Sequence, residues 1–392
     1  MHKRLSSEKT TDLQMVTIND IARLAHVDKG AVSRTLRNHR DAQRLRPETR
    51  ERILRIAAEL GYQPNQLASS TRTGIVRSIA LIGHFFNSTL YFSASQIISG
   101  ILSESTKQGY GVKMYDSADL KKAFAEIVGN RIRYLLSFCA ERPAREEQAR
   151  FCRENGIQIV YLYEHAVGEY PAVNIDNLAA SSMLVHHLAE RGHRRIALLC
   201  VPHREELYSY VRERHEGYFR SMKELGLPVD PDLVSCSDDV EAAVARMLAY
   251  PPEKRPTAFY GISDNQIMRA QRVAVRLGFR LPEDLAMVGF GNNEASNLAV
   301  ASITTVEEEF FRRGELAVKI LFGDRNGLPP MSNGTYLIPP SLIVRESSGV
   351  CRESRRDAGG KGNAGKPLPQ CIADRKTTAA KRRKGERDAD IG

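Results

Sequence analysis

Residues 75–350 alternate short β-branched runs with amphipathic stretches of helical period, and no other feature constrains the fold as strongly. The strand candidates are Ile79–Ile82, Tyr134–Phe138, Ile157–Tyr163, Arg195–Val201, Thr257–Ile262 and Leu285–Phe290. Helical stretches lie between them, near residues 93–108, 144–155, 177–191, 212–225, 239–250 and 264–277. This alternation predicts an α/β fold whose parallel sheets carry helices on both faces. Because a single hydrophobic core stops growing at about 250–300 residues, a chain of 392 residues is expected to form several structural units.

A different pattern occupies residues 16–62, where three short helical segments follow one another. The first is predicted to begin after Thr17, the second after the N-cap Asp28, and the third at Pro47. Each has an apolar stripe on one face. The turn between the first two helices, at Val27, is so short that the second helix must cross the first steeply. That arrangement is typical of a helix-turn-helix.

Positive charge is concentrated at the two ends of the chain, whose formal net charge is +10. Residues 1–74 hold 14 Lys and Arg against 8 Asp and Glu, and residues 351–392 hold 12 against 6. A nearly neutral body with a compact basic head is the charge distribution of a nucleic-acid-binding protein. Residues 1–15 are expected to form a flexible leader, and residues 351–392, which have few large apolar side chains, a disordered basic tail.

Several other classes of protein are disfavoured by the sequence. No apolar run is long enough for a membrane helix and no secretory signal is visible, so a cytoplasmic location is expected. The six cysteines form no CxxC pair, which predicts reduced thiols. His186, His187 and His193 are expected to be packed or solvated side chains, and no metal site or other cofactor is predicted. No catalytic motif stands in a suitable context, so an enzyme is not expected.

Further motifs follow one another in a fixed order along residues 16–348. In the head they are Val16 to Ala25, Val32-Ser33-Arg34, Pro47 to Arg52 and Leu60 to Asn65. In the body they include Asp176-Asn177, Arg191 to Ala197, Gly217-Tyr218, Leu281 to Asp284, Val288-Gly289-Phe290, Thr304-Thr305-Val306 and Leu342 to Ser347. Together these motifs resemble the lactose-repressor (LacI/GalR) family of bacterial transcription regulators.

The resemblance implies three parts with distinct roles. These are a helix-turn-helix DNA-binding headpiece (16–62), a hinge helix (63–74) and a two-lobed core like a periplasmic binding protein (75–350). The core is expected to bind a small-molecule effector in the cleft between its lobes and to form a homodimer or higher homo-oligomer. Its lobes are predicted as an N-lobe of about residues 75–175 plus 303–325 and a C-lobe of about residues 176–302 plus 326–350.

In such a headpiece the second helix enters the major groove with its N-terminal side chains against the base edges. The exposed candidates are Lys29, Gly30, Ser33 and Arg34. The resemblance makes Arg34 a base-contacting residue, and its guanidinium can bridge O6 and N7 of guanine; a phosphate contact without sequence preference is the alternative. Thr17 and Asn38 are predicted to hold phosphate oxygens.

Four positions of the headpiece depart from the family pattern. His26 replaces a glycine, Asp28 a serine and Ala31 a threonine, and the turn from His39 to Leu45 is longer. The fold is expected to tolerate these changes, whereas the hydroxyl missing at residue 31 removes one expected DNA contact.

The hinge, residues 64–72, is too short to be a stable helix alone in water and is expected to order on DNA. Leu67 and Ala68 are predicted DNA-contacting residues, with Leu67 packed between the paired hinge helices. Thr71 stands where the family has a leucine that wedges between base pairs, so a shallower bend is expected. Arg72 is predicted to reach into the minor groove.

The effector site departs more strongly from the family pattern. The resemblance places Arg214 and Asp264 on the ligand, and an arginine with a carboxylate suits a sugar or sugar derivative. The remaining candidates are Phe85, Tyr91, Tyr163 and Asn292. Gly291 and Ser263 replace an Asp and an Asn of the family. The aromatic candidates are as compatible with core packing as with stacking on a sugar ring.

The predicted function is a sequence-specific DNA-binding transcriptional regulator of repressor type that binds a near-palindromic operator and responds to an effector. The alternative is a two-lobed receptor of transport type. Such a receptor would have a signal peptide and no basic three-helix head, and this sequence shows the opposite.

Overall fold

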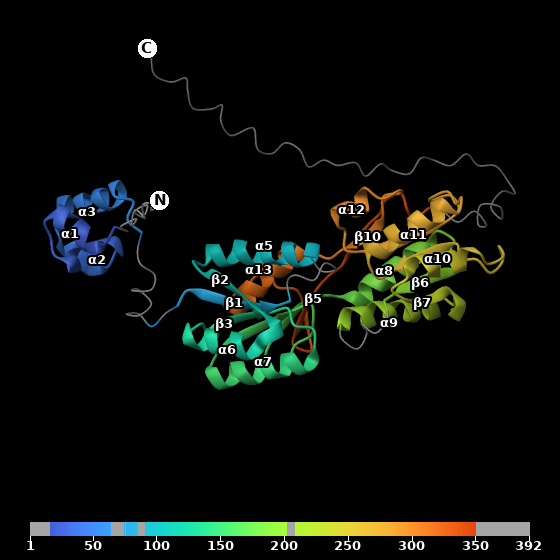
Figure 1. The fold of residues 1–392 in the computed structure, drawn as a ribbon, viewed down its shortest axis with the longest axis horizontal. Helices are drawn as coiled ribbons and strands as arrows, with labels where there is room; N and C mark the ends of the chain where they lie inside the picture. The colour runs from blue at the N-terminus through green and yellow to red at the C-terminus, as the bar shows by residue number, and fades with distance from the viewer. Residues whose placement is uncertain (1–15, 64–73, 75, 85–90, 202–207, 350–392) are drawn as a thin grey trace, which may run out of the picture. The chain divides into compact units, whose positions relative to one another are not determined.

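The computed structural model describes residues 16–63, 74, 76–84, 91–201 and 208–349 (Figure 1). The predicted leader, hinge helix and basic tail therefore lie outside the described residues. Contacts within the core define two compact units. Within the described part of the core, the first unit contains residues 76–176, 208–210 and 309–339. The second unit contains residues 177–201, 211–308 and 340–349. None of the described helices is long and apolar enough to cross a membrane.

The headpiece consists of three α-helices with a 3₁₀ turn, in the order α1 (Ile18–Ala25), α2 (Lys29–Leu36), η1 (Arg40–Arg44) and α3 (Pro47–Glu59). Their apolar stripes meet in one small core of fully or largely buried side chains, formed by Ile21, Ala22, Ala25, Val32, Ile53 and Ala57. The three predicted helices are confirmed.

Two left-handed residues close the first two helices. His26, at the C-cap of α1, has a φ of 51°, and its backbone N–H donates to carbonyl oxygens of the last turn. The second helix ends at Leu36, because Arg37 forms the C-cap and Asn38 has a φ of 50°. The long turn that follows is ordered as η1.

The first unit is built on a seven-stranded sheet with the order β11-β12-β5-β4-β3-β1-β2. Its strands are β1 (Ser78–Gly83), β2 (Gly111–Asp116), β3 (Tyr134–Ser137), β4 (Gln158–Leu162), β5 (Ala172–Ile175), β11 (Met331–Ser332) and β12 (Thr335–Ile338). Its helices are α5 (Tyr91–Lys107), α6 (Leu120–Gly129), α7 (Arg142–Asn155) and α13 (Phe310–Leu321), with the 3₁₀ turn η2 (Ser117–Asp119) before α6. All pairings are parallel except that of β11 with β12.

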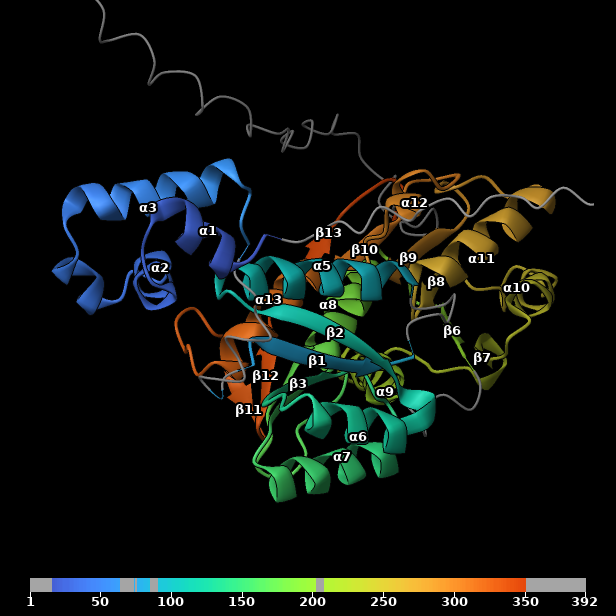
Figure 2. The ribbon, with the colours of Figure 1, turned by 60° about the vertical axis from the view of Figure 1, so that its left-hand side comes forward.

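Alternating side chains of β1 supply two separate cores on the two faces of this sheet. Ile79 and Leu81 pack on the face covered by α5 and α13. Ala80 and Ile82 pack on the face covered by α6 and α7. Figure 2 shows the sheet between these two helix layers. A strand buried on both faces explains the continuous apolar run in the sequence.

The second unit is built on a six-stranded sheet with the order β13-β10-β9-β8-β6-β7. Its strands are β6 (Ile196–Cys200), β7 (Val234–Cys236), β8 (Ala258–Gly261), β9 (Ala286–Phe290), β10 (Thr304–Glu307) and β13 (Ser341–Ile343). Its helices are α8 (Asn177–Glu190), α9 (Ser209–Glu224), α10 (Val240–Leu248), α11 (Asp264–Arg276) and α12 (Glu294–Asn297), with the 3₁₀ turn η3 (Pro231–Leu233). Only β13 is antiparallel to its neighbour, so both sheets are mixed rather than purely parallel.

The predicted lobe boundaries after residue 300 are wrong. Strand β10 pairs with β9, so residues 304–307 belong to the second unit and not to the N-lobe. Strand β12 pairs with β5, so residues 335–338 belong to the first unit and not to the C-lobe. The reason is that strand pairing over such sequence separations leaves no periodic signal in either partner.

Two histidines of the second unit, His187 and His193, are buried and packed. His187 lies 2.8 Å from the Ser348 hydroxyl, and burial lowers the pKa of His187 to about 4. His193 contacts Thr257 and the backbone oxygen of Gly349. The four cysteines within the described residues are free thiols, which confirms that prediction for Cys139, Cys152, Cys200 and Cys236.

Candidate functional site

The N-terminus of α2 is held by an aspartate cap. The Asp28 carboxylate accepts a hydrogen bond of 2.9 Å from the backbone N–H of Ala31. That bond lowers the pKa of Asp28, so the cap is negatively charged at neutral pH. Lys29 follows at the first helical position and is exposed.

Arg34 lies one turn beyond Gly30 on α2. Its side chain is 41% exposed, and Nη2 lies 3.9 Å from Oδ1 of Asp28. Val32 is fully buried in the headpiece core and Leu36 packs against that core. The helix therefore presents Lys29 and Arg34 outward and its apolar side inward, which is the orientation that a recognition helix needs.

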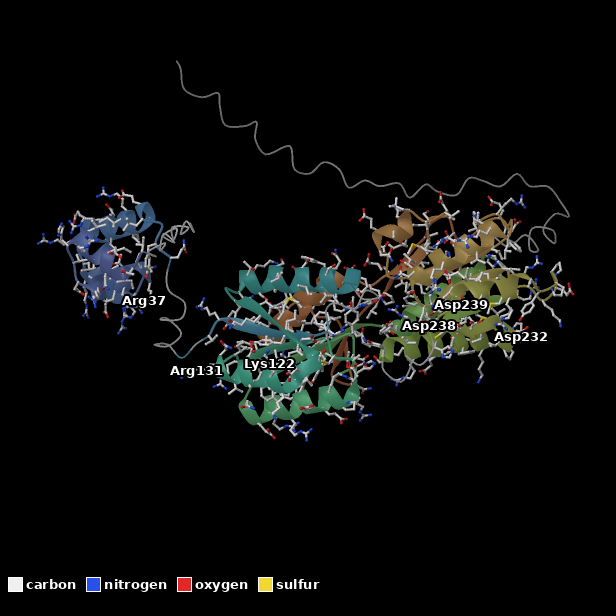
Figure 3. The ribbon with its side chains drawn as sticks, in the orientation of Figure 1. Arg37, Lys122, Arg131, Asp232, Asp238 and Asp239 are labelled. Carbon is white, nitrogen blue, oxygen red and sulfur yellow. The ribbon has the colours of Figure 1, made fainter. Side chains whose placement is uncertain are left out.

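Sequence reasoning missed Arg37, which lies at the surface of the headpiece (Figure 3). Its Nε donates a 2.8 Å hydrogen bond to the backbone oxygen of Ser33, and Nη2 donates to the Ser33 hydroxyl. The spacing of four residues places the two side chains on one helix face, and this spacing was the signal available in the sequence. The guanidinium of Arg37 therefore lies next to Ser33.

The two predicted phosphate contacts lie at exposed positions of the headpiece. The hydroxyl and backbone N–H of Thr17 donate to the Asp20 carboxylate over 2.7 and 3.0 Å, which forms the expected capping box. Asn38 follows the end of α2 and is exposed. Their role on DNA stays a prediction. Leu67, Ala68, Thr71 and Arg72 lie outside the described residues.

In the second unit Arg214 is enclosed by protein groups. Its Nη2 lies 2.7 Å from Glu308, and the two side chains are only 5% and 6% exposed. Nε donates to Asn177 over 2.8 Å and Nη1 to the backbone oxygen of Ile262 over 2.9 Å. The Phe290 ring covers the guanidinium, with its centroid 4.2 Å from Cζ. Glu308 therefore forms the kind of charged contact with the Arg214 guanidinium that a ligand carboxylate could form.

Asp264 is also engaged within the second unit. It is fully buried, accepts a 2.7 Å hydrogen bond from the Thr305 hydroxyl, and has its pKa raised to about 7 by that burial. A Cβ at Gly289 would lie 2.5 Å from Asp264 Oδ1, so the carboxylate fills the space that a side chain would need. The Gly291 backbone, at a φ of 118°, is one that only glycine adopts readily.

Asn292 is tied to its neighbours in the same way. Its Nδ2 donates to Glu307 over 2.5 Å, and its Oδ1 accepts from Arg345. The three predicted effector residues of the second unit thus support the loops around β9 and β10. This arrangement was hidden in the sequence because their partners lie far along the chain.

The first unit contains a cavity of about 450 Å³ at the C-terminal edge of its sheet. The residues that directly follow four strands of the sheet line it, namely His84, Ser117, Phe138 and Tyr163. Tyr208, Tyr210 and Glu141 contribute further lining. The outer end of parallel strands is the usual ligand position in open α/β sheets, and the volume suits a small molecule.

A buried ion pair anchors the backbone between Tyr208 and Tyr210. Glu164 accepts a 2.9 Å hydrogen bond from the backbone N–H of Ser209, which stands between Tyr208 and Tyr210. Nη2 of Arg145 lies 3.4 Å from the Glu164 carboxylate. Burial raises the pKa of Glu164.

Of the aromatic candidates, Tyr163 lines the cavity, with its ring 5.7 Å from that of Phe138. Phe85 lies outside the described residues, and of Tyr91 only the backbone is described, at the start of α5. Phe138, Tyr208 and Tyr210 were missed. The position of Phe138 at a strand end was the signal for one of them, whereas the tyrosines reach the cavity by tertiary contacts alone.

Comparisons with known proteins agree with this architecture. The model of the lacI family of bacterial regulatory proteins matches residues 17–65, and that of a periplasmic binding protein-like domain matches residues 185–348. The HTH-type transcriptional repressor CytR of Escherichia coli (strain K12) is 30% identical over 343 residues, which are 85% of this chain and 96% of that protein. The NTD biosynthesis operon regulator NtdR of Bacillus subtilis (strain 168) is 27% identical, over 85% of this chain and all of that protein.

Among solved structures, the lac repressor dimer bound to operator and the anti-inducer ONPF superposes with a TM-score of 0.71 at 21% identity, covering 86% of this chain and all of that one. The complex of the transcriptional regulator CelR with cellobiose superposes with a TM-score of 0.57 at 25% identity, covering 85% and 99%.

A helix-turn-helix headpiece followed by two mostly parallel α/β units defines a DNA-binding transcriptional regulator with an effector-binding core. The chain belongs to the lacI family of bacterial regulatory proteins. The alternative of a transport-type receptor without a regulatory DNA role is not favoured.

Proposed function

We propose that the protein is a homodimeric repressor that acts in the cytoplasm on a near-palindromic operator and responds to a small-molecule effector. The observation that carries the proposal is the outward face of α2, where Lys29 and the half-exposed Arg34 project from a buried apolar side. One headpiece of this size presents few base contacts. Pairing two headpieces makes the second contact intramolecular, so a dimer gains affinity and reads two half-sites.

Arg34→Ala tests the base-reading role. If Arg34 bridges guanine, the variant is expected to lose about 1–3 kcal/mol of binding free energy per half-site on the preferred operator and far less on random duplex. Fluorescence anisotropy with both duplexes measures the two losses. Arg55→Ala is the control, because Arg55 is an exposed arginine of α3 whose side chain is 70% exposed. Equal losses on both duplexes would make Arg34 a phosphate contact.

We further propose that the effector is a sugar or sugar derivative and that it binds in the cavity of the first unit. Four aromatic rings, those of Phe138, Tyr163, Tyr208 and Tyr210, line the cavity together with His84, Ser117 and Glu141. Rings offer flat apolar faces for a pyranose or furanose, while the hydroxyl, imidazole and carboxylate groups offer hydrogen bonds to its hydroxyls. The similar regulator CelR forms a complex with cellobiose, which is a sugar.

Tyr210→Ala is expected to weaken effector binding about tenfold, because one wall of the cavity loses its ring. Operator binding without effector should stay unchanged. Calorimetry of the full chain with a panel of sugars and nucleosides provides the measurement. Tyr250→Ala, which truncates a half-buried tyrosine of the second unit, is the matched control. Unaltered effector affinity in Tyr210→Ala would place the ligand elsewhere.

A further inference from the structure

The N-cap Asp28 and two residues of α2, Gly30 and Arg34, form a compact group at the N-terminal end of the helix. A Cβ built on Gly30 would lie 2.8 Å from Asp28 Oδ1 and 2.9 Å from Arg34 Nη1. Both charged side chains therefore extend across Gly30, and they approach each other to 3.9 Å. The missing side chain at Gly30 is what makes room for them.

The backbone does not require a glycine at this position. Gly30 is not among the residues with positive φ, and it lies inside an eight-residue helix. Glycine in a helix is less favourable than alanine by about 0.5–1 kcal/mol. A glycine that the backbone conformation does not explain points to the space above it, and that space holds the Asp28 carboxylate and the Arg34 guanidinium.

The charge of Asp28 has opposite consequences for binding to DNA of any sequence and for the reading of guanine. The carboxylate is ionised, since the Ala31 N–H stabilises the charged form. A negative charge on a surface that meets DNA repels phosphates and so weakens binding to any sequence. The same carboxylate attracts a guanidinium, whose five N–H donors allow one edge to face Asp28 while another faces guanine.

We propose that Asp28 and Gly30 are positioning residues that determine specificity: Asp28 holds Arg34 in the orientation that reads guanine and disfavours random DNA, and Gly30 leaves room for the pair. The proposal rests on the proposed function of α2 as the operator-reading helix. It extends that function by assigning the selectivity to a three-residue unit.

The test uses the full chain and three duplexes: the preferred operator, the same operator with the guanine opposite Arg34 replaced in both half-sites, and a random sequence. Asp28→Asn removes the charge and keeps an oxygen for the Ala31 N–H. Because an exposed ion pair contributes about 1.4- to fivefold, and a dimer has two, discrimination between the two operators should fall by about two- to 25-fold. Binding to the random duplex should tighten by about the same factor.

Two variants separate positioning from general electrostatics. Asp41→Asn removes an equal charge from η1, where Asp41 pairs with Arg44 over 3.6 Å, and should leave discrimination unchanged. Gly30→Ala retains every charge but fills the space under the pair, so it should lower discrimination without tightening binding to the random duplex. Circular dichroism verifies that the helices persist.

The outcomes are distinct. Loss of discrimination in Asp28→Asn and Gly30→Ala, but not in Asp41→Asn, supports the proposal. If Asp28→Asn and Asp41→Asn change binding to all three duplexes by one common factor, or if Gly30→Ala discriminates as the parent does, the positioning role is overturned. A parent protein that binds the three duplexes equally would instead contradict the proposed function itself.

Discussion

Replacing Glu308 by alanine is expected to lower the free energy of unfolding of the core by about 3–5 kcal/mol, because it leaves a guanidinium buried without its carboxylate. Arg214 and Glu308 lie 2.7 Å apart, and neither side chain is more than 6% exposed. Two further hydrogen bonds of Arg214, to Asn177 and to the backbone oxygen of Ile262, go to neutral acceptors. Urea denaturation of the full chain, followed by circular dichroism, measures the loss.

Two comparisons show whether burial causes this effect. Glu224→Ala breaks the exposed Arg220–Glu224 pair of α9, whose side chains are 67% and 47% exposed, and should change stability by no more than about 0.5 kcal/mol. The double variant Arg214→Met/Glu308→Leu should recover most of the loss, since it removes both charges. A loss below about 1 kcal/mol in Glu308→Ala would mean that solvent reaches the pair.

Gly314→Ala is expected to destabilise the first unit by about 3 kcal/mol through a backbone clash. A Cβ at Gly314 of α13 would lie 2.1 Å from the backbone oxygen of Ile97 and 2.8 Å from the backbone nitrogen of Ile101, both in α5. Neither atom can rotate away as a side chain could, so the two helices must separate and open the core that they cover.

The matched control is Gly129→Ala, because Gly129 is also a helical glycine but has no atom within 4 Å of the Cβ position. Here the same substitution should stabilise the protein by about 0.5–1 kcal/mol, since alanine is the better helix former. Calorimetry of both variants measures their melting temperatures, which should fall in Gly314→Ala and rise in Gly129→Ala. Equal melting temperatures would contradict the close approach of α5 and α13.

The sequence predicted those elements whose signal is local. The period of the apolar residues, the N-caps Thr17 and Asp28, and the first-position proline Pro47 located the three headpiece helices. The strands β1, β3 and β4 were found because they are buried on both faces and read as continuous apolar runs. In contrast β2, at the edge of the first sheet, was missed because most of its side chains are exposed and no such run marks it.

The candidate effector site was harder to predict because the partners of its residues are distant in sequence. The resemblance implies that Arg214 and Asp264 contact the ligand, and this stays a prediction; the structure adds their protein partners, Glu308 and Thr305. No periodicity connects these residues. Tyr163 was found because it stands at the end of a predicted strand, but Tyr208 and Tyr210 have no such position.

The central claim is that the chain reads a specific DNA sequence as a paired headpiece. The most direct test is to let the full chain select duplexes from a random pool and then to measure the affinity for the enriched sequences by fluorescence anisotropy. The account predicts enrichment of a near-palindrome with a guanine in each half-site, bound at least about 10³-fold more tightly than random DNA. If no sequence is enriched, or the enriched sites bind as random duplex does, the account is contradicted.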